Sequence, residues 1–185
     1  MPETGKWQQD GAERVVTYVS DYTAILSDWT WSQNEGTPAV VTYSFPAASW
    51  DEVAETYGAA AANSFVAFTA TQRALAEQAL DAWAAACGLV FVEVAAGEGD
   101  IRFGNFDFSL MAGAETYSGY AYYPARGTGS YNSWENEIGG DVFINLTRIN
   151  DLSFGLILHE LGHAIGLEHP FSGDIQLEAA YDNGT

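Results

Sequence analysis

The chain has 185 residues, a length that favours one domain over two. Its hydrophobic share of 48% is enough to bury an ordinary core, which argues against disorder over the body of the chain. Six Lys and Arg stand against 25 Asp and Glu, and because the formal net charge of -19 repels phosphate backbones and anionic lipid, we expect no nucleic-acid partner and no membrane partner.

Residues 1–37 are polar and are predicted to form an irregular N-terminal segment, followed by one folded domain over residues 38–185. The N-terminal segment has no apolar run of the kind found in secretory signal peptides. No later stretch approaches the ~18 uninterrupted apolar residues of a membrane span. We therefore expect neither a cleaved signal of this type nor a membrane anchor, while export by another route stays open.

The first strand is predicted to begin at Ala39 and to end at Pro46, and the alanine-rich stretch after it indicates short local helix. A long helix then begins at Thr69, which has capping-box spacing with Gln72, and ends at Gly88. One face of this helix is apolar and is expected to cover a sheet; its members are Ala76, Leu80, Trp83 and Cys87. We expect the cysteine of this face, the single one in the chain, to be a small buried side chain.

Four further strands are predicted over residues 89–94, 100–106, 119–124 and 141–145, and a second long helix over 151–166. The segment GYAYYP at 119–124 ends in proline, which confines it to a sheet edge or a strand terminus. An edge strand can accept an extended peptide by strand addition. In the alternative interpretation its tyrosines only pack against or cap the sheet; they are Tyr120, Tyr122 and Tyr123.

Every histidine of the chain lies in HELGHAIGLEHP, residues 159–170. On a helix, His159 and His163 are four residues apart and share one face, so both imidazoles can reach one metal ion. Gly166 can adopt a left-handed conformation that redirects the chain and brings His169 back as a third ligand. Three neutral imidazoles with a position open for water are typical of a catalytic zinc site.

Glu160 projects from a neighbouring angle of the same helix, where it can accept a proton from that water instead of binding the metal. Zinc lowers the pKa of bound water toward ~7 and polarises a substrate carbonyl, so the proton transfer comes at modest cost. The sequence therefore predicts peptide-bond hydrolysis, with Glu160 as the general base and the three histidines as zinc ligands.

The same stretch matches H-E-x-x-H-x-x-G-x-x-H, the metzincin signature, at every fixed position, and the chain resembles the metzincin metallopeptidases. Pro170 and the segments TYSFP, DIRFGN, GYAYYP and GDVFIN, in this order, are similar to the serralysins, bacterial secreted endopeptidases. The resemblance covers roughly residues 24–170. It implies an α+β fold with a mixed, twisted five-stranded sheet, an antiparallel edge strand and two long helices, with zinc bound on the second helix.

The resemblance also makes residues 38–185 the peptidase catalytic domain and places Ala121 and Tyr122 of the edge strand beside the substrate. The chain departs from the pattern after the third histidine. Metzincins carry a methionine-containing turn there, whereas the two methionines of this chain are Met1 and Met111. Serralysins add a tyrosine just after that turn, a role we do not assign to Tyr181. We expect the sequence to be a catalytic-domain portion that stops before the turn.

The leading hypothesis is a zinc-dependent endopeptidase that acts on protein or peptide substrates, as a monomer, outside the cell, a location that rests on the resemblance. The alternative is a module that binds zinc without cleaving and acts in binding or adhesion. Calcium is a second candidate ion because the chain is acidic. Glu160 favours catalysis, since a binding module needs no general base beside a ligand histidine.

Overall fold

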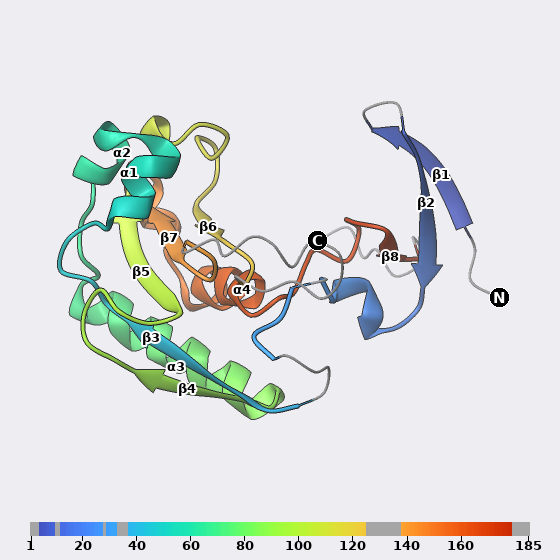
Figure 1. Ribbon diagram of the computed structural model, residues 1–185, viewed down its shortest axis with the longest axis horizontal. Helices are drawn as coiled ribbons and strands as arrows, with labels where there is room; N and C mark the ends of the chain where they lie inside the picture. The colour runs from blue at the N-terminus through green and yellow to red at the C-terminus, as the bar shows by residue number, and fades with distance from the viewer. Residues whose placement is uncertain (1–3, 10–11, 28, 33–36, 125–137, 179–185) are drawn as a thin grey trace.

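The computed structural model describes residues 4–9, 12–27, 29–32, 37–124 and 138–178. Its centre is a five-stranded sheet with the strand order β4-β3-β5-β7-β6 (Figure 1). The strands are β3 (Ala39–Ser44), β4 (Leu89–Glu93), β5 (Ile101–Phe106), β6 (Gly119–Ala121) and β7 (Val142–Asn145). Strands β3, β4, β5 and β7 run parallel, whereas β6 lies antiparallel to β7 at the edge. The predicted mixed sheet with an antiparallel edge strand is therefore confirmed.

The main hydrophobic core lies between this sheet and two long helices, α3 (Ala70–Ala86) and α4 (Phe154–Ala164). Side chains alternate across a strand, so β7 sends Val142 and Ile144 into this core and Phe143 to the opposite face. Both helices contribute fully buried side chains, among them Ala76 and Ala79 of α3 and Ile157 and Leu161 of α4. The packing fixes α4 against the sheet, close to β6 (Figure 1).

The opposite face of the sheet is covered by the short helices α1 (Asp51–Tyr57) and α2 (Ala59–Asn63) and the 3-10 turn η2 (Phe108–Leu110). Short helix was expected in this alanine-rich stretch. Phe106 and Phe143 meet there with ring centroids 4.9 Å apart. No helix among the described residues is long and apolar enough to cross a membrane.

Helix α3 begins as predicted and corrects one expectation at its end. Thr69 Oγ1 accepts a hydrogen bond from Gln72 N at 3.3 Å, and Gln72 Oε1 accepts one from Thr69 N at 2.8 Å, which completes the capping box. The prediction that Cys87 is buried is wrong, because its side chain is exposed. Cys87 has an extended backbone (φ -134°, ψ 173°), so the helical spacing that placed it on the apolar face no longer applies after Ala86.

The N-terminal segment, predicted to be irregular over residues 1–37, contains two strands, and this is a second correction. Strand β1 (Thr4–Gln9) pairs antiparallel with β2 (Ala12–Val19), which pairs parallel with β8 (Ile175–Leu177). A two-stranded hairpin is marginal on its own. Its third strand comes from the far end of the chain, so no local pattern reveals the sheet. The domain boundary between residues 37 and 38 stays a prediction.

We expect Phe103→Ala to lower the free energy of unfolding by about 3–5 kcal/mol, because the ring is fully buried and its loss leaves a cavity. Phe103 lies at the centre of the core, with its ring centroid 5.1 Å from that of Phe45 and 5.5 Å from that of Phe68. Urea unfolding followed by tryptophan fluorescence measures the effect. Val40→Ala, at a side chain 65% exposed on β3, should cost less than about 1 kcal/mol; equal losses would contradict this placement of the core.

Candidate metal centre and cleft

Helix α4 carries the first two histidines on one side. Ser153 Oγ accepts a hydrogen bond from Leu156 N at 3.1 Å and begins the helix. Helix α4 runs from Phe154 to Ala164 and is shorter than the helix predicted over 151–166. The 3-10 turn η3 (Leu146–Asp151) precedes it. Ile157, Leu161 and Ala164 anchor the buried side of α4 in the core. His159 and His163 lie on the more accessible side, one turn apart.

The turn after α4 returns the chain toward these two histidines. Gly166 has φ +101°, and the hydrogen bonds Leu167 N to Gly162 O (2.8 Å) and Gly166 N to His163 O (2.9 Å) form a Schellman motif. A methyl group at Gly166 would lie 2.2 Å from the carbonyl oxygen of Trp29. The left-handed exit predicted at Gly166 is confirmed, and both the backbone conformation and the space require glycine.

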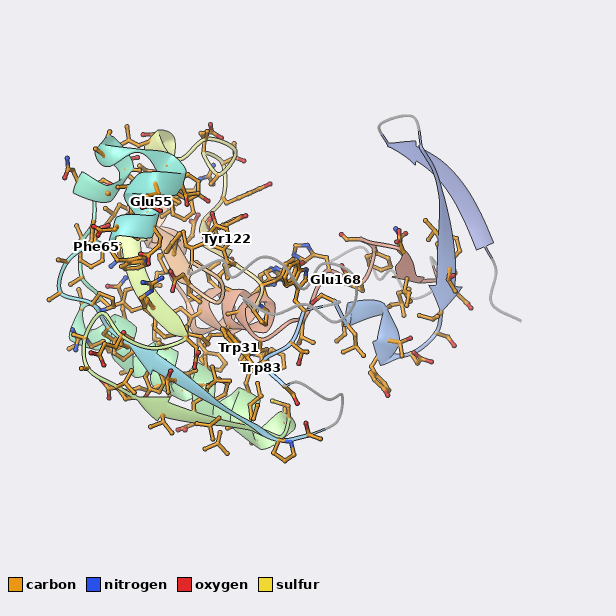
Figure 2. All side chains as sticks on the ribbon, viewed as in Figure 1. Trp31, Glu55, Phe65, Trp83, Tyr122 and Glu168 are labelled. Atoms are coloured by element: carbon orange, nitrogen blue, oxygen red, sulfur yellow. The ribbon has the colours of Figure 1, made fainter. Side chains whose placement is uncertain are left out.

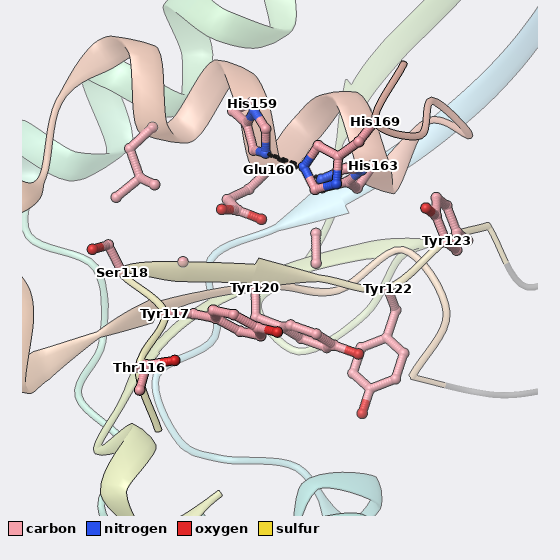
Figure 3. Close-up of a pocket in the computed structure, with 13 residues that line it drawn as sticks. Thr116, Tyr117, Ser118, Tyr120, Tyr122, Tyr123, His159, Glu160, His163 and His169 are labelled. Carbon is pink, nitrogen blue, oxygen red and sulfur yellow. Dashed lines mark hydrogen bonds between the residues drawn. The ribbon is translucent and has the colours of Figure 1, made fainter. Parts of the chain in front are cut away.

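The three imidazoles converge at the end of this turn (Figure 3). The Nε2 atom of His159 lies 3.2 Å from that of His163 and 3.1 Å from that of His169. The ligand atoms of all three lie within 4.8 Å of one another. No other group of three or more His, Cys, Asp or Glu side chains in the described part of the chain is close enough to hold an ion. The histidine triad can hold a metal ion, and its all-imidazole donor set suits zinc.

The protonation of the triad also suits a metal. The Nδ1 atom of His163 lies 2.7 Å from the carbonyl oxygen of Leu167, so Nδ1 carries the proton and the Nε2 lone pair faces the other two rings. Burial lowers the pKa of His159 and of His163. Both rings are therefore neutral at neutral pH, the form that binds a metal ion.

Glu160 is the acidic side chain buried beside the triad. Its side chain is only 5% exposed, and burial raises the pKa of its carboxyl to about 7. It projects toward β6, where Gly119 leaves the room that it occupies (Figure 3). A methyl group at Gly119 would lie 2.7 Å from both Cγ and Oε1 of Glu160. The absence of a side chain at Gly119 thus permits the position of the carboxylate.

The triad and Glu160 line one wall of a cleft of about 700 Å³, and β6 with its flanking residues lines the other. Tyr123 lies at the triad end, where its ring centroid is 5.9 Å from that of His163. At the other end, Ser118 Oγ donates a hydrogen bond to Asp151 Oδ2 at 2.7 Å. The cleft therefore follows the edge strand and passes the imidazoles.

The two edge-strand residues expected beside the substrate face opposite sides of the sheet. Ala121 packs against the core that includes α4. Tyr122 packs on the far face, where its hydroxyl lies 2.5 Å from that of Tyr57 and its ring centroid 6.0 Å from that of Phe143. Figure 3 shows Tyr120 and Tyr122 on the side of β6 away from the histidines. The packing interpretation of the tyrosines therefore describes these two side chains, although both border the cleft.

Two further residues bear on this site, Met111 and Gly119. Met111 is fully buried in the cluster that covers the opposite face of the sheet, so it does not support the triad from below. Gly119 was not singled out from the sequence. A glycine inside a strand pattern often marks a close approach by another group, and this signal in GYAYYP could have identified it.

Comparisons with known proteins agree with this geometry. The family model described as Matrixin matches residues 49–184. Serralysin of Photorhabdus laumondii subsp. laumondii is 30% identical over 124 residues, which are 65% of this chain and 25% of that protein. Serralysin G of Dickeya chrysanthemi is 29% identical over 144 residues, 77% of this chain and 29% of that protein. Serralysin of Proteus mirabilis is 31% identical over 159 residues, 78% of this chain and 30% of that protein. The chain thus spans less than a third of the length of these relatives.

Proposed function

Since this chain belongs to the matrixin family of peptidases, we propose that it is a zinc-dependent endopeptidase that hydrolyses peptide bonds in protein substrates. The observation that carries the proposal is the placement of Glu160, a buried carboxyl beside three convergent imidazoles in the wall of a cleft. A site that only binds metal does not require a carboxyl in that place.

In this proposal each residue of the centre has one role. His159, His163 and His169 hold the ion through their Nε2 atoms. Zinc, when bound, acidifies a water molecule and polarises the substrate carbonyl. Glu160 accepts the proton of the attacking water and delivers it to the nitrogen of the leaving amine. The raised pKa of Glu160 suits a group that must both take and give a proton near neutral pH.

We place the substrate along β6 as an added strand. Tyr122 N donates to Asp141 O at 3.0 Å, and Ser118 O accepts from Asn145 N at 3.0 Å, so these groups bond toward β7. Because bonding direction alternates along an antiparallel strand, the backbone groups of Gly119 and Ala121 point away from the sheet, toward the cleft. An extended peptide paired there runs past the triad. Ala121 then contributes backbone hydrogen bonds, while Tyr122 supports the strand from behind.

The setting of this activity is part of the proposal. A location outside the cell is proposed from the family resemblance, and a monomeric state is proposed with it. Calcium stays a candidate ion, but not at the histidine triad, because calcium takes oxygen ligands. The triad is the one ion-binding cluster among the described residues. The activity and substrates of the whole protein are likewise proposals, because the chain spans only 25% to 30% of the length of the three relatives.

Hydrolysis of a quenched fluorescent protein substrate by the zinc-loaded chain tests the proposal. We expect cleavage that a chelator abolishes and added zinc restores, because the three imidazoles have no function in hydrolysis without the ion. Mass spectrometry of the products should show cuts inside the substrate chain. A folded sample that binds zinc and leaves the substrate intact would instead support the binding-module alternative.

A further inference from the structure

A segment of the N-terminal part of the chain lies against the turn that carries His169. We call residues 25–27 and 29–31 the N-terminal strap. Leu26 forms an isolated antiparallel bridge with Leu167, and Glu168 N donates to Ile25 O at 2.9 Å. These contacts join parts of the chain that are about 140 residues apart in sequence, and they end one residue before His169.

The strap also satisfies two carbonyl groups, one at the last residue of α4 and one in the turn that follows. The last carbonyls of a helix have no partner within the helix. Ser27 donates to Gly166 O twice, from its backbone N at 3.0 Å and from its Oγ at 2.7 Å. Trp31 Nε1 donates to Ala164 O at 2.9 Å. Figure 2 shows the indole of Trp31 beside α4, on the same side as that of Trp83.

The chain beyond His169 is also held by N-terminal residues, in this case those of β2. Thr17 N donates to Asp174 O at 2.8 Å, and Glu178 N donates to Val19 O at 2.9 Å, within the pairing of β2 with β8. The loop from Gly166 to Asp174 is therefore attached to N-terminal residues on both sides of His169. His159 and His163 do not depend on these contacts, because α4 itself fixes them.

We propose that Ser27 and Trp31 are positioning residues that hold His169 at the distance from His159 and His163 that a shared metal ion requires. The inference rests on the metal centre of the proposed function. Without the two side-chain donors, the turn at Gly166 loses hydrogen bonds to two carbonyl oxygens, and His169 is the ligand whose position changes. Groups that hydrogen-bond directly to metal ligands typically contribute about 10–100-fold to metal affinity, and we expect an effect in this range from two donors that hold the turn carrying His169.

Zinc affinity, measured by competition with a chromophoric chelator on the full chain, tests this role. We expect Ser27→Ala combined with Trp31→Phe to weaken zinc binding by about 10–100-fold. The visible absorption of the cobalt-loaded variant should move toward that of His169→Ala, because a displaced His169 binds the ion less well and His169→Ala removes this ligand altogether. Trp31→Phe alone removes only one of the two side-chain donors and should show a smaller loss than the double variant. Both variants keep an aromatic ring at position 31, and circular dichroism of the metal-free samples separates a missing donor from a failure to fold.

Trp50→Phe is the matched control. Its indole packs on the opposite face of the sheet and donates to Asp141 Oδ2 at 2.9 Å, so the same substitution removes an indole hydrogen bond away from the turn, and zinc affinity should stay unchanged. Unaltered zinc affinity in the double variant would overturn the role of the strap. An unaltered chain that binds neither zinc nor cobalt would overturn the metal centre and the inference with it. This outcome is measured without any variant, so it is distinct from a failure of the strap alone.

Discussion

Glu160→Gln should lower kcat/KM for peptide hydrolysis by about 10²–10⁴-fold, the range that a positioned general base contributes. Glutamine has the shape of glutamate and cannot take a proton from water. Zinc affinity should remain that of the unaltered chain, because the ligand atoms come from His159, His163 and His169. Steady-state kinetics on a fluorogenic peptide, together with chelator competition, measures both quantities.

The same variant offers a check on folding. Burial disfavours the charged form of the Glu160 carboxyl, as its raised pKa indicates, so a neutral amide in its place should leave the metal-free fold at least as stable at pH 8. Glu55→Gln, at an exposed side chain of α1, serves as the control and should keep full activity. Equal kcat/KM for Glu160→Gln and Glu55→Gln would exclude Glu160 as the base.

Gly119→Ala is expected to lower kcat by about 100-fold through Glu160. The added methyl group would lie 2.7 Å from Cγ and Oε1 of the glutamate, so the carboxyl must move. A displacement of about 1 Å at a reacting group can cost about 100-fold in rate. Zinc affinity should not change. Gly155→Ala is a matched control on α4, because its new methyl group would meet only Ser153 Oγ, at 3.8 Å.

A double-mutant cycle separates this mechanism from a simple block of substrate binding. If Gly119→Ala acts by moving Glu160, adding it to Glu160→Gln should cause little further loss of kcat, since the base is already absent. If the methyl group instead obstructs the substrate, KM should rise and the two losses should multiply. The second result would reject the proposed dependence of Glu160 on Gly119.

Much of the candidate site is encoded locally, in a stretch of eleven residues. The spacing of His159 and His163 places them on one helical face, because an α-helix repeats every 3.6 residues. The left-handed turn at Gly166 needs a glycine, and the structure has φ +101° there. The capping box at Thr69 follows from the spacing of Thr69 and Gln72. The strands of the sheet follow from their β-branched and aromatic composition. Such features depend only on neighbours in sequence, which is why they could be predicted.

The remaining features depend on contacts between distant parts of the chain. Gly119 matters because packing brings β6 against Glu160, 41 positions later in the sequence. Cys87 is a local exception, exposed because α3 ends at Ala86, a boundary that helical spacing does not reveal. The strand pairing of β2 with β8 and the contacts of Ser27 with Gly166 join the two ends of the chain. Long-range hydrogen bonds and packing leave no periodic pattern in a sequence, so the support around the third histidine becomes evident only in the folded chain.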